Sequence, residues 1–232
     1  MKKTAIRTYK LQIIYTALLT ACAPLAALWI LYATKVGETI STEASGIAIL
    51  LIFLPVVIYW CAVLAMGICN IVCSFRLYRQ NCVQECLDSM LILKYGLVAF
   101  FCVNFIVLAV SYSMFTLAAV VGTRGIALLF APVLLPWLIL ALAGSVFFTW
   151  LAMLPGSFYS IQVLRIGYRE HKIGLGGCIG HLVLQFLFLT DVLDSMYLAT
   201  KKFGVGKKSS AVIGVIYIAG VIGTIWFVMQ LI

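Results

Sequence analysis

Residues 46–75 read GIAILLIFLPVVIYWCAVLAMGICNIVCSF and contain no charged side chain. A transmembrane helix needs about 20 predominantly apolar residues, because the hydrocarbon core of a bilayer is about 30 Å thick and a helix rises about 1.5 Å per residue. The stretch is therefore predicted to cross a membrane as one helix. Pro55 lies inside it and is expected to kink it, since proline removes a backbone hydrogen bond.

Similar apolar stretches, separated by short basic connectors, fill most of the remaining chain. They predict an all-α fold, in which residues 1–232 form one polytopic integral membrane domain of about six transmembrane helices. The predicted spans are residues 11–33, 46–75, 90–121, 134–155 with an extension to 166, 177–200 and 210–232.

The composition agrees with a membrane protein. Hydrophobic residues make up 65% of the chain and charged residues 10%, whereas soluble domains are about 45–50% apolar and about 25% charged. The connectors leave no room for a soluble domain of about 100 residues, which excludes a membrane enzyme with its chemistry in a large cytoplasmic domain. The net charge is +9. The Lys and Arg residues are expected to set the orientation of the protein in the membrane and to contact lipid head groups, and no binding of nucleic acid is expected.

The distribution of Lys and Arg predicts a plasma-membrane protein, of the kind found in the bacterial inner membrane, with a cytoplasmic N-terminus. Six crossings then place ten basic residues inside and six outside, and the outside set includes the four lysines at 201–208. If segment 177–200 instead returns to the cytoplasm, the split becomes fourteen to two and the C-terminus lies outside. Six crossings are preferred because the segment is long enough to span. Lys94, in the third span, is expected to extend toward the head groups.

Segment 177–200 is the predicted functional helix, because a carboxylate inside a bilayer is costly and usually faces an interior or a cavity. At 100° per residue, one broad face carries its polar side chains, namely His181, Gln185, Thr190, Asp191, Asp194 and Ser195. Asp191 and Asp194 are helix neighbours, and their mutual repulsion favours binding of a proton or cation. In the alternative, both lie near the interface and are neutralised by Lys201, Lys202 or a basic residue of another helix. Asn104 is expected to face the same cavity, or to make only an interhelical hydrogen bond.

Small residues four apart mark the first and last spans as faces that allow close helix packing. This packing either serves the chain itself or docks another subunit. The residues concerned are Ala17 with Ala21, Ala23 with Ala27, and Gly214, Ala219 and Gly223.

No catalytic residues, metal or cofactor are predicted, and an enzyme is the less favoured class. A nucleophile, a base and an orienting group cannot be assembled from the sequence. The four cysteines at 69, 73, 82 and 86 are spaced more widely than usual zinc ligands, so packing is preferred for them. The leading hypothesis is a transporter or channel-like protein for an ion or small solute. The alternative is a non-catalytic membrane subunit docked onto a larger complex. The expected partners are membrane lipids and a second copy or another membrane protein.

Overall fold

The computed structural model describes residues 9–39, 45–188 and 190–231, which form helices and turns without a strand. This confirms the all-helical prediction. The α-helices are α2 (Lys10–Thr20), α3 (Cys22–Thr39), α4 (Ser45–Arg79), α5 (Val83–Gly122), α6 (Ala131–Arg169), α7 (Leu175–Leu184), α8 (Thr190–Tyr197) and α9 (Lys207–Leu231). A 3-10 helix at Ile126–Phe130 precedes α6, and a π-helical turn at Leu198–Lys202 follows α8.

Four helices of the described residues, α4, α5, α6 and α9, are each long and apolar enough to cross a membrane. The bent pair α2 and α3 makes a fifth if it is counted as one span. The predicted fifth span, residues 177–200, is not a continuous helix. It is divided into α7 and α8, and α7 has only 10 residues.

The first predicted span, residues 11–33, is bent by 48° between α2 and α3. Pro24 explains the bend. Proline has no N–H to donate to the carbonyl of Thr20, four residues earlier, and its ring clashes with that carbonyl. The helix therefore breaks at Ala21, which lies between the two segments.

The helices on either side of the connector between the predicted spans 46–75 and 90–121 extend beyond those spans. Helix α4 continues to Arg79 and α5 begins at Val83, so the turn between them contains only three residues. Asn81 adopts a left-handed conformation there, with φ of 56°, which asparagine tolerates better than most residues. Asp88, expected in the connector, lies inside α5 and accepts a hydrogen bond of 2.9 Å from the Tyr9 hydroxyl.

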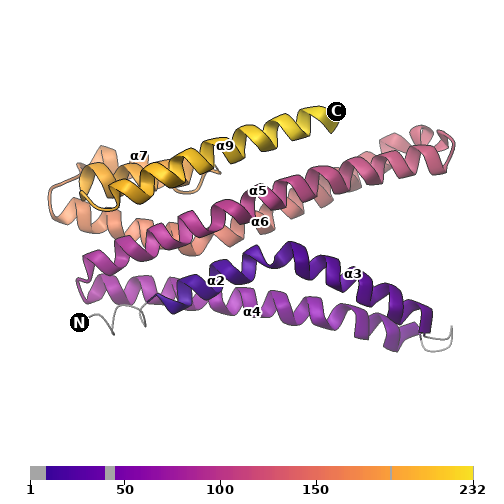
Figure 1. The fold of residues 1–232 in the computed structure, drawn as a ribbon, viewed down its shortest axis with the longest axis horizontal. Coiled ribbons are helices and arrows are strands. Elements are labelled where there is room, and N and C mark those ends of the chain that lie inside the picture. The colour runs from indigo at the N-terminus through magenta and orange to yellow at the C-terminus, as the bar shows by residue number, and fades with distance from the viewer. Residues whose placement is uncertain (1–8, 40–44, 189, 232) are drawn as a thin grey trace.

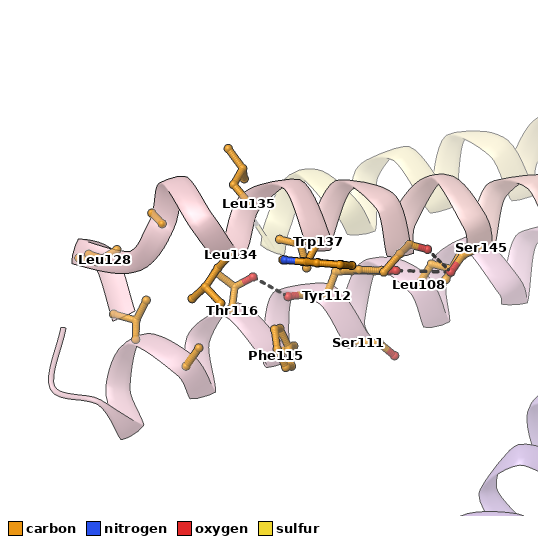
Figure 2. A pocket seen from close by; sticks show the side chains of 15 residues that line it. Leu108, Ser111, Tyr112, Phe115, Thr116, Leu128, Leu134, Leu135, Trp137 and Ser145 are labelled. Atoms are coloured by element: carbon orange, nitrogen blue, oxygen red, sulfur yellow. Dashed lines mark hydrogen bonds between the residues drawn. The ribbon is translucent and has the colours of Figure 1, made fainter. Parts of the chain in front are cut away.

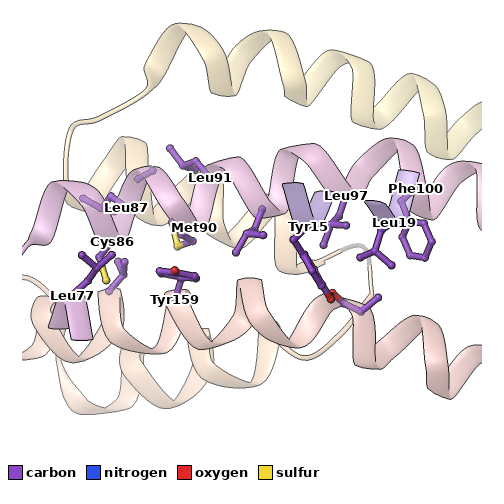
Figure 3. Close-up of a cluster of buried hydrophobic side chains, with 14 of the residues drawn as sticks. Tyr15, Leu19, Leu77, Cys86, Leu87, Met90, Leu91, Leu97, Phe100 and Tyr159 are labelled. Atoms are coloured by element: carbon purple, nitrogen blue, oxygen red, sulfur yellow. The ribbon is translucent and has the colours of Figure 1, made fainter. Parts of the chain in front are cut away.

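Figure 1 shows α5 and α6 as long neighbours, with α2, α3 and α4 on one side and α9 on the other. The main core lies between α2, α5 and α6, where Tyr15 and Tyr159 pack with Leu97, Met90 and other apolar side chains of α5 (Figure 3). Helix α2 approaches α5 closely at Gly96, where an added Cβ would lie 2.8 Å from the Thr16 side chain.

Helix α9 runs from the end of the bundle where α2 starts toward the other end, and it stops short of the far ends of α5 and α6 (Figure 1). Helix α6 ends, and α9 begins, at the end where α2 starts. Segment 175–202 therefore leaves this end and returns to it as a short hairpin. The basic residues around it lie at the same end: Arg169 donates to Asn81 at 2.8 Å, and the Lys172 ammonium lies 4.6 Å from the Phe203 ring centroid.

Candidate functional site: a buried charged cluster

Lys94 and Asp191 form a buried ion pair between α5 and α8. Lys94 Nζ lies 2.8 Å from Asp191 Oδ2, and the two side chains are 1% and 2% exposed. The ammonium also donates a hydrogen bond of 3.1 Å to Ser157 Oγ on α6. Lys94 is eleven residues into α5, which places it roughly 16 Å along the helix from its start at Val83. Three helices thus meet at one lysine deep in the bundle.

Asp194 holds the second buried carboxylate, one helical turn from Asp191. His181 Nδ1 lies 2.5 Å from Asp194 Oδ1, and Gln185 Nε2 donates to Asp194 Oδ2 at 2.6 Å. The His181 side chain is 17% exposed while that of Asp194 is 4% exposed, so the histidine connects the carboxylate to the outside. The His181 ring also stacks on Tyr197, with centroids 5.6 Å apart.

The break between α7 and α8 makes the contact between His181 and Asp194 possible. On a continuous helix, two residues thirteen apart would be separated by roughly 20 Å along the axis. The chain instead folds back after Gln185, so that both side chains meet directly. The polar face predicted for residues 177–200 does gather at one place, but through a hairpin and not along one helix.

Side chains satisfy the carbonyls that this break releases from helical hydrogen bonds. Ser157 Oγ donates to the Gln185 carbonyl at 2.8 Å, and the Trp150 indole donates to the Phe186 carbonyl at 3.1 Å. The Thr190 hydroxyl donates to the Leu184 carbonyl at 3.0 Å. Non-helical backbone away from water is tolerated where such partners replace the lost bonds. These donors, two of them on α6, fix the hairpin.

Hydrogen bonds of Gln185 and Ser195 hold the two arms of the hairpin together beside the carboxylates. The Gln185 amide nitrogen donates to Asp194, and Ser195 Oγ lies 3.2 Å from Gln185 Oε1 and 2.8 Å from the backbone carbonyl oxygen of Asp191. We call Lys94, His181, Asp191 and Asp194 the charged cluster.

Gly156 makes room for the lysine. A Cβ at this position would lie 3.2 Å from Lys94 Cε and 3.4 Å from Cδ. Helix α6 continues through Pro155-Gly156 to Arg169, and the glycine leaves space for the Lys94 side chain.

Two expectations about single residues differ from the structure. Lys94 does not extend to the head groups, because it is 1% exposed and pairs with Asp191. Lys94 is thus a basic residue of another helix that neutralises Asp191, as the alternative interpretation of the two aspartates proposed. Asn104 lies outside the charged cluster and donates to Thr149 Oγ1 at 2.8 Å, as in the interhelical alternative. The sequence reasoning missed this role of Lys94, although a lysine inside an apolar span is a signal for an acidic partner, since such charges usually pair with one another.

The small-residue faces divide into inner and outer positions. Gly214 faces the hairpin, where its added Cβ would lie 3.7 Å from Met196 Sδ. Ala21 and Ala23 are half-buried beside the bend. The exposed positions are Ala17, Ala27, Ala219 and Gly223.

A cavity of about 700 Å³ lies away from the charged cluster. It is a groove between the far ends of α5 and α6, into which Tyr112, Phe115, Leu134 and Trp137 project (Figure 2). The described residues that line it carry no charge, so we place the candidate site at the charged cluster. Within the described residues, no three His, Cys, Asp or Glu side chains lie close enough together to hold a metal ion.

No curated protein and no solved structure matches the chain at a significant level. A protein family does match, over residues 11–204, a range that contains the whole charged cluster and ends before α9. Because this match covers most of the chain, the protein belongs to the family of unknown function DUF6652.

Proposed function

We propose that the protein is a small proton-coupled membrane transporter in which the His181–Asp194 pair binds the proton. The observation that carries the proposal is the charge balance of the buried cluster. Lys94 and Asp191 neutralise each other, and the second carboxylate binds His181, an ionisable side chain, and the neutral Gln185 amide. Ionisable groups at membrane depth are costly and usually mark ion or proton pathways.

A hydrogen bond between His181 Nδ1 and Asp194 Oδ1 requires one proton between the two groups. With that proton alone the pair carries a charge of −1, and with a second proton on the imidazole it is neutral. Histidine is the side chain that changes charge in the physiological pH range. Its partial exposure gives the second proton a route to the buried carboxylate. Proton binding thus changes the net charge of the cluster from −1 to 0.

The same proposal places the chain in a plasma membrane with the N-terminus in the cytoplasm. The hairpin 175–202 begins and ends at the basic end of the bundle, so its lysines join those of the other cytoplasmic connectors. The positive-inside rule is then obeyed along the whole chain, and five crossings put the C-terminus outside.

Proton flux into proteoliposomes, followed with an enclosed pH-sensitive dye under an imposed potential, tests the proposal. We expect flux in the wild type and its loss in Asp194→Asn. His181→Gln should lower it at least tenfold while the protein elutes as a single folded species. Asn104→Ala is the matched control, since it removes a polar side chain of α5 outside the cluster and should retain flux within twofold. Unchanged flux in folded Asp194→Asn would contradict the assignment.

A second candidate, a non-catalytic subunit of a larger membrane complex, is favoured by the outer face of α9. Ala219 and Gly223 are exposed, and among the described residues a Cβ added at Gly223 would meet no heavy atom within 4 Å apart from its chain neighbours and its own helix backbone. This candidate predicts that Gly223→Leu loses a stoichiometric partner in native mass measurements of the gently solubilised protein, while the isolated chain keeps its stability. Retention of every partner in Gly223→Leu would exclude docking through this face.

A further inference from the structure

A largely apolar groove of about 200 Å³ lies between α6 and α7, at the basic end of the bundle. Its walls include Ile161 and Leu164 of α6 and Leu175, Ile179 and Leu182 of α7. No residue of α7 is buried, and Ile179 is 56% exposed, so the groove is open on the outside of the bundle. In a chain that spans a bilayer, lipid lies against this surface.

The groove has a polar end and an apolar end. Helix α7 turns back along α6, where Cys178 Sγ donates to the Leu164 carbonyl at 3.8 Å. Arg165 and Tyr168 line the groove in the last turns of α6, whereas Ile161 lines it roughly 10 Å deeper than Tyr168. This direction matches an amphiphile whose head group lies at the membrane surface and whose hydrocarbon chain points into the bilayer.

Two guanidinium groups at the polar end have only neutral partners. The guanidinium carbons of Arg165 and Arg169 lie 4.4 and 5.7 Å from the centroid of the Tyr78 ring. Arg165 also donates to Gln162 Oε1 at 3.2 Å, and Arg169 donates to Asn81 Oδ1 at 2.8 Å. Among the described residues, neither arginine forms an ion pair. Because arginine is always charged, two positive charges are fixed at one ring without a negative charge to balance them.

Neighbouring charges increase this positive excess. Arg76 and Arg79 lie in the last turn of α4 and are exposed. Glu170, which follows Arg169 in the sequence, is already paired with Lys172 at 2.7 Å. Basic pockets between the helices of membrane proteins bind anionic lipid head groups, and the planar guanidinium matches the geometry of phosphate oxygens.

We propose that this site binds an anionic phospholipid, with its phosphate on Arg165 and Arg169 and one acyl chain in the groove between α6 and α7. Each part of the site selects one part of the ligand, because the guanidinium groups favour a negative head group and the groove favours a hydrocarbon chain. A neutral lipid or a free phosphate ester fulfils only one of these conditions. The inference goes beyond the proposed function, since neither arginine belongs to the charged cluster and no proton is moved.

The test is native mass spectrometry of the delipidated protein in a gentle detergent, titrated with dioleoylphosphatidylglycerol. Dioleoylphosphatidylcholine has the same acyl chains but no net charge, and it is the matched control. One phosphatidylglycerol per chain should bind, at least tenfold more tightly than phosphatidylcholine. Equal affinities would overturn the proposal, because the groove would then select the acyl chain alone.

Glycerol 3-phosphate, which carries the anionic group without an acyl chain, distinguishes a lipid from a free phosphate ester. We expect that it neither binds in the same concentration range nor displaces the bound lipid. Binding of glycerol 3-phosphate as tight as that of the lipid would show that the groove contributes nothing, and the assignment to a lipid would be wrong.

Arginine variants test the contact with the head group. Arg165→Gln removes the positive charge but keeps a polar side chain, and it should weaken phosphatidylglycerol binding at least tenfold. Arg124→Gln is the control, because Arg124 is exposed in the turn between α5 and α6, and it should leave binding within twofold. Arg169→Gln replaces the first variant if that protein does not fold. Undiminished binding in the folded variant would overturn the assignment of the phosphate.

Two positions of α7 give a matched pair of variants for the acyl chain. Ile179 and Val183 are both 56% exposed, but only Ile179 is among the residues that line the groove. Ile179→Trp narrows the groove and should weaken phosphatidylglycerol binding at least tenfold, whereas Val183→Trp should leave it within twofold. Equal binding by the two folded variants would show that the acyl chain does not lie in this groove, which would overturn the proposal.

Discussion

At the scale of single residues, Lys94 and Asp191 depend on each other. Removing one partner of a buried ion pair leaves an uncompensated charge and costs about 3–5 kcal/mol, whereas replacing both with apolar residues is often close to neutral. Lys94→Met should therefore lower the free energy of unfolding by about 3–5 kcal/mol. The double variant Lys94→Met/Asp191→Leu should recover most of the loss. Denaturant titration of the purified protein in detergent measures both.

The pair formed by Lys172 and Glu170 is the matched control for this prediction. Its atoms are 2.7 Å apart, but the side chains are 42% and 34% exposed. Exposed pairs contribute about 0–1 kcal/mol, so Lys172→Met should change the unfolding free energy by no more than about 1 kcal/mol. Equal losses in Lys94→Met and Lys172→Met would show that the buried pair carries no special weight.

Two glycines of α6 provide a second prediction at this scale. Gly156→Ala brings a methyl group 3.2 Å from Lys94 Cε, a stem held at its end by two hydrogen bonds, and should destabilise the protein by about 1–3 kcal/mol. Gly144→Ala enters open space in the same helix and should stabilise it by about 0.5–1 kcal/mol. Thermal unfolding of the two variants in one detergent separates them by sign. Stabilisation by both would show that the lysine stem adjusts freely.

At the scale of elements, the sequence predicted where apolar segments lie but not where helices break or end. The break before α8 is stabilised by hydrogen-bond donors of another helix, Ser157 and Trp150 of α6. The sequence of the hairpin segment itself does not reveal these partners. The bend after Thr20 was readable in principle, since Pro24 lies in the segment. Helix α4 continues to Arg79 because arginine side chains suit a helix end, so the charges did not mark a connector.

The hairpin break yields the prediction for this scale. Thr190→Val keeps the side-chain volume but removes the hydroxyl that donates to the Leu184 and Leu187 carbonyls, at 3.0 and 3.3 Å. An unsatisfied carbonyl costs about 1–3 kcal/mol, so the hairpin should open more easily. Hydrogen exchange of amides 185–195 should become faster, with little change in α4. Thr116→Val is the control, because its hydroxyl binds the Tyr112 carbonyl within a regular helix. Identical exchange in Thr190→Val and wild type would contradict the role of the hydroxyl.

At the scale of the whole molecule, composition was sufficient for the fold class, because so apolar a chain has to form long helices that satisfy their own backbone. The polar side chains in the apolar segment 177–200 also indicated a candidate site around Asp191 and Asp194, since buried carboxylates are rare and need partners. The pairing itself was out of reach. Which side chain meets Asp191 depends on how α5 packs against the hairpin, and Lys94 shares no local pattern with residues 97 positions away.

The hairpin also determines the sides of the two chain ends in the proposed topology. In that topology segment 175–202 returns to its own end, and the proposed crossings are the bent pair α2 and α3, then α4, α5, α6 and α9, an odd number. Reporter fusions after Lys172 and at the C-terminus should therefore report opposite sides: fluorescence of a cytoplasmic reporter after Lys172, and activity of an exported phosphatase after Ile232. A fusion after Gly125, in the turn between α5 and α6, is the control for the outer side.

The four lysines at 201–208 allow a test of what keeps the hairpin on the inner side. According to the positive-inside rule, their positive charges hold it there. Replacing all four with glutamine should weaken that retention and lower phosphatase activity at the C-terminus. Full phosphatase activity after this replacement would show that the buried contacts of the charged cluster hold the hairpin without the lysines. Fluorescence of a reporter at the C-terminus of the unaltered chain would instead support six crossings.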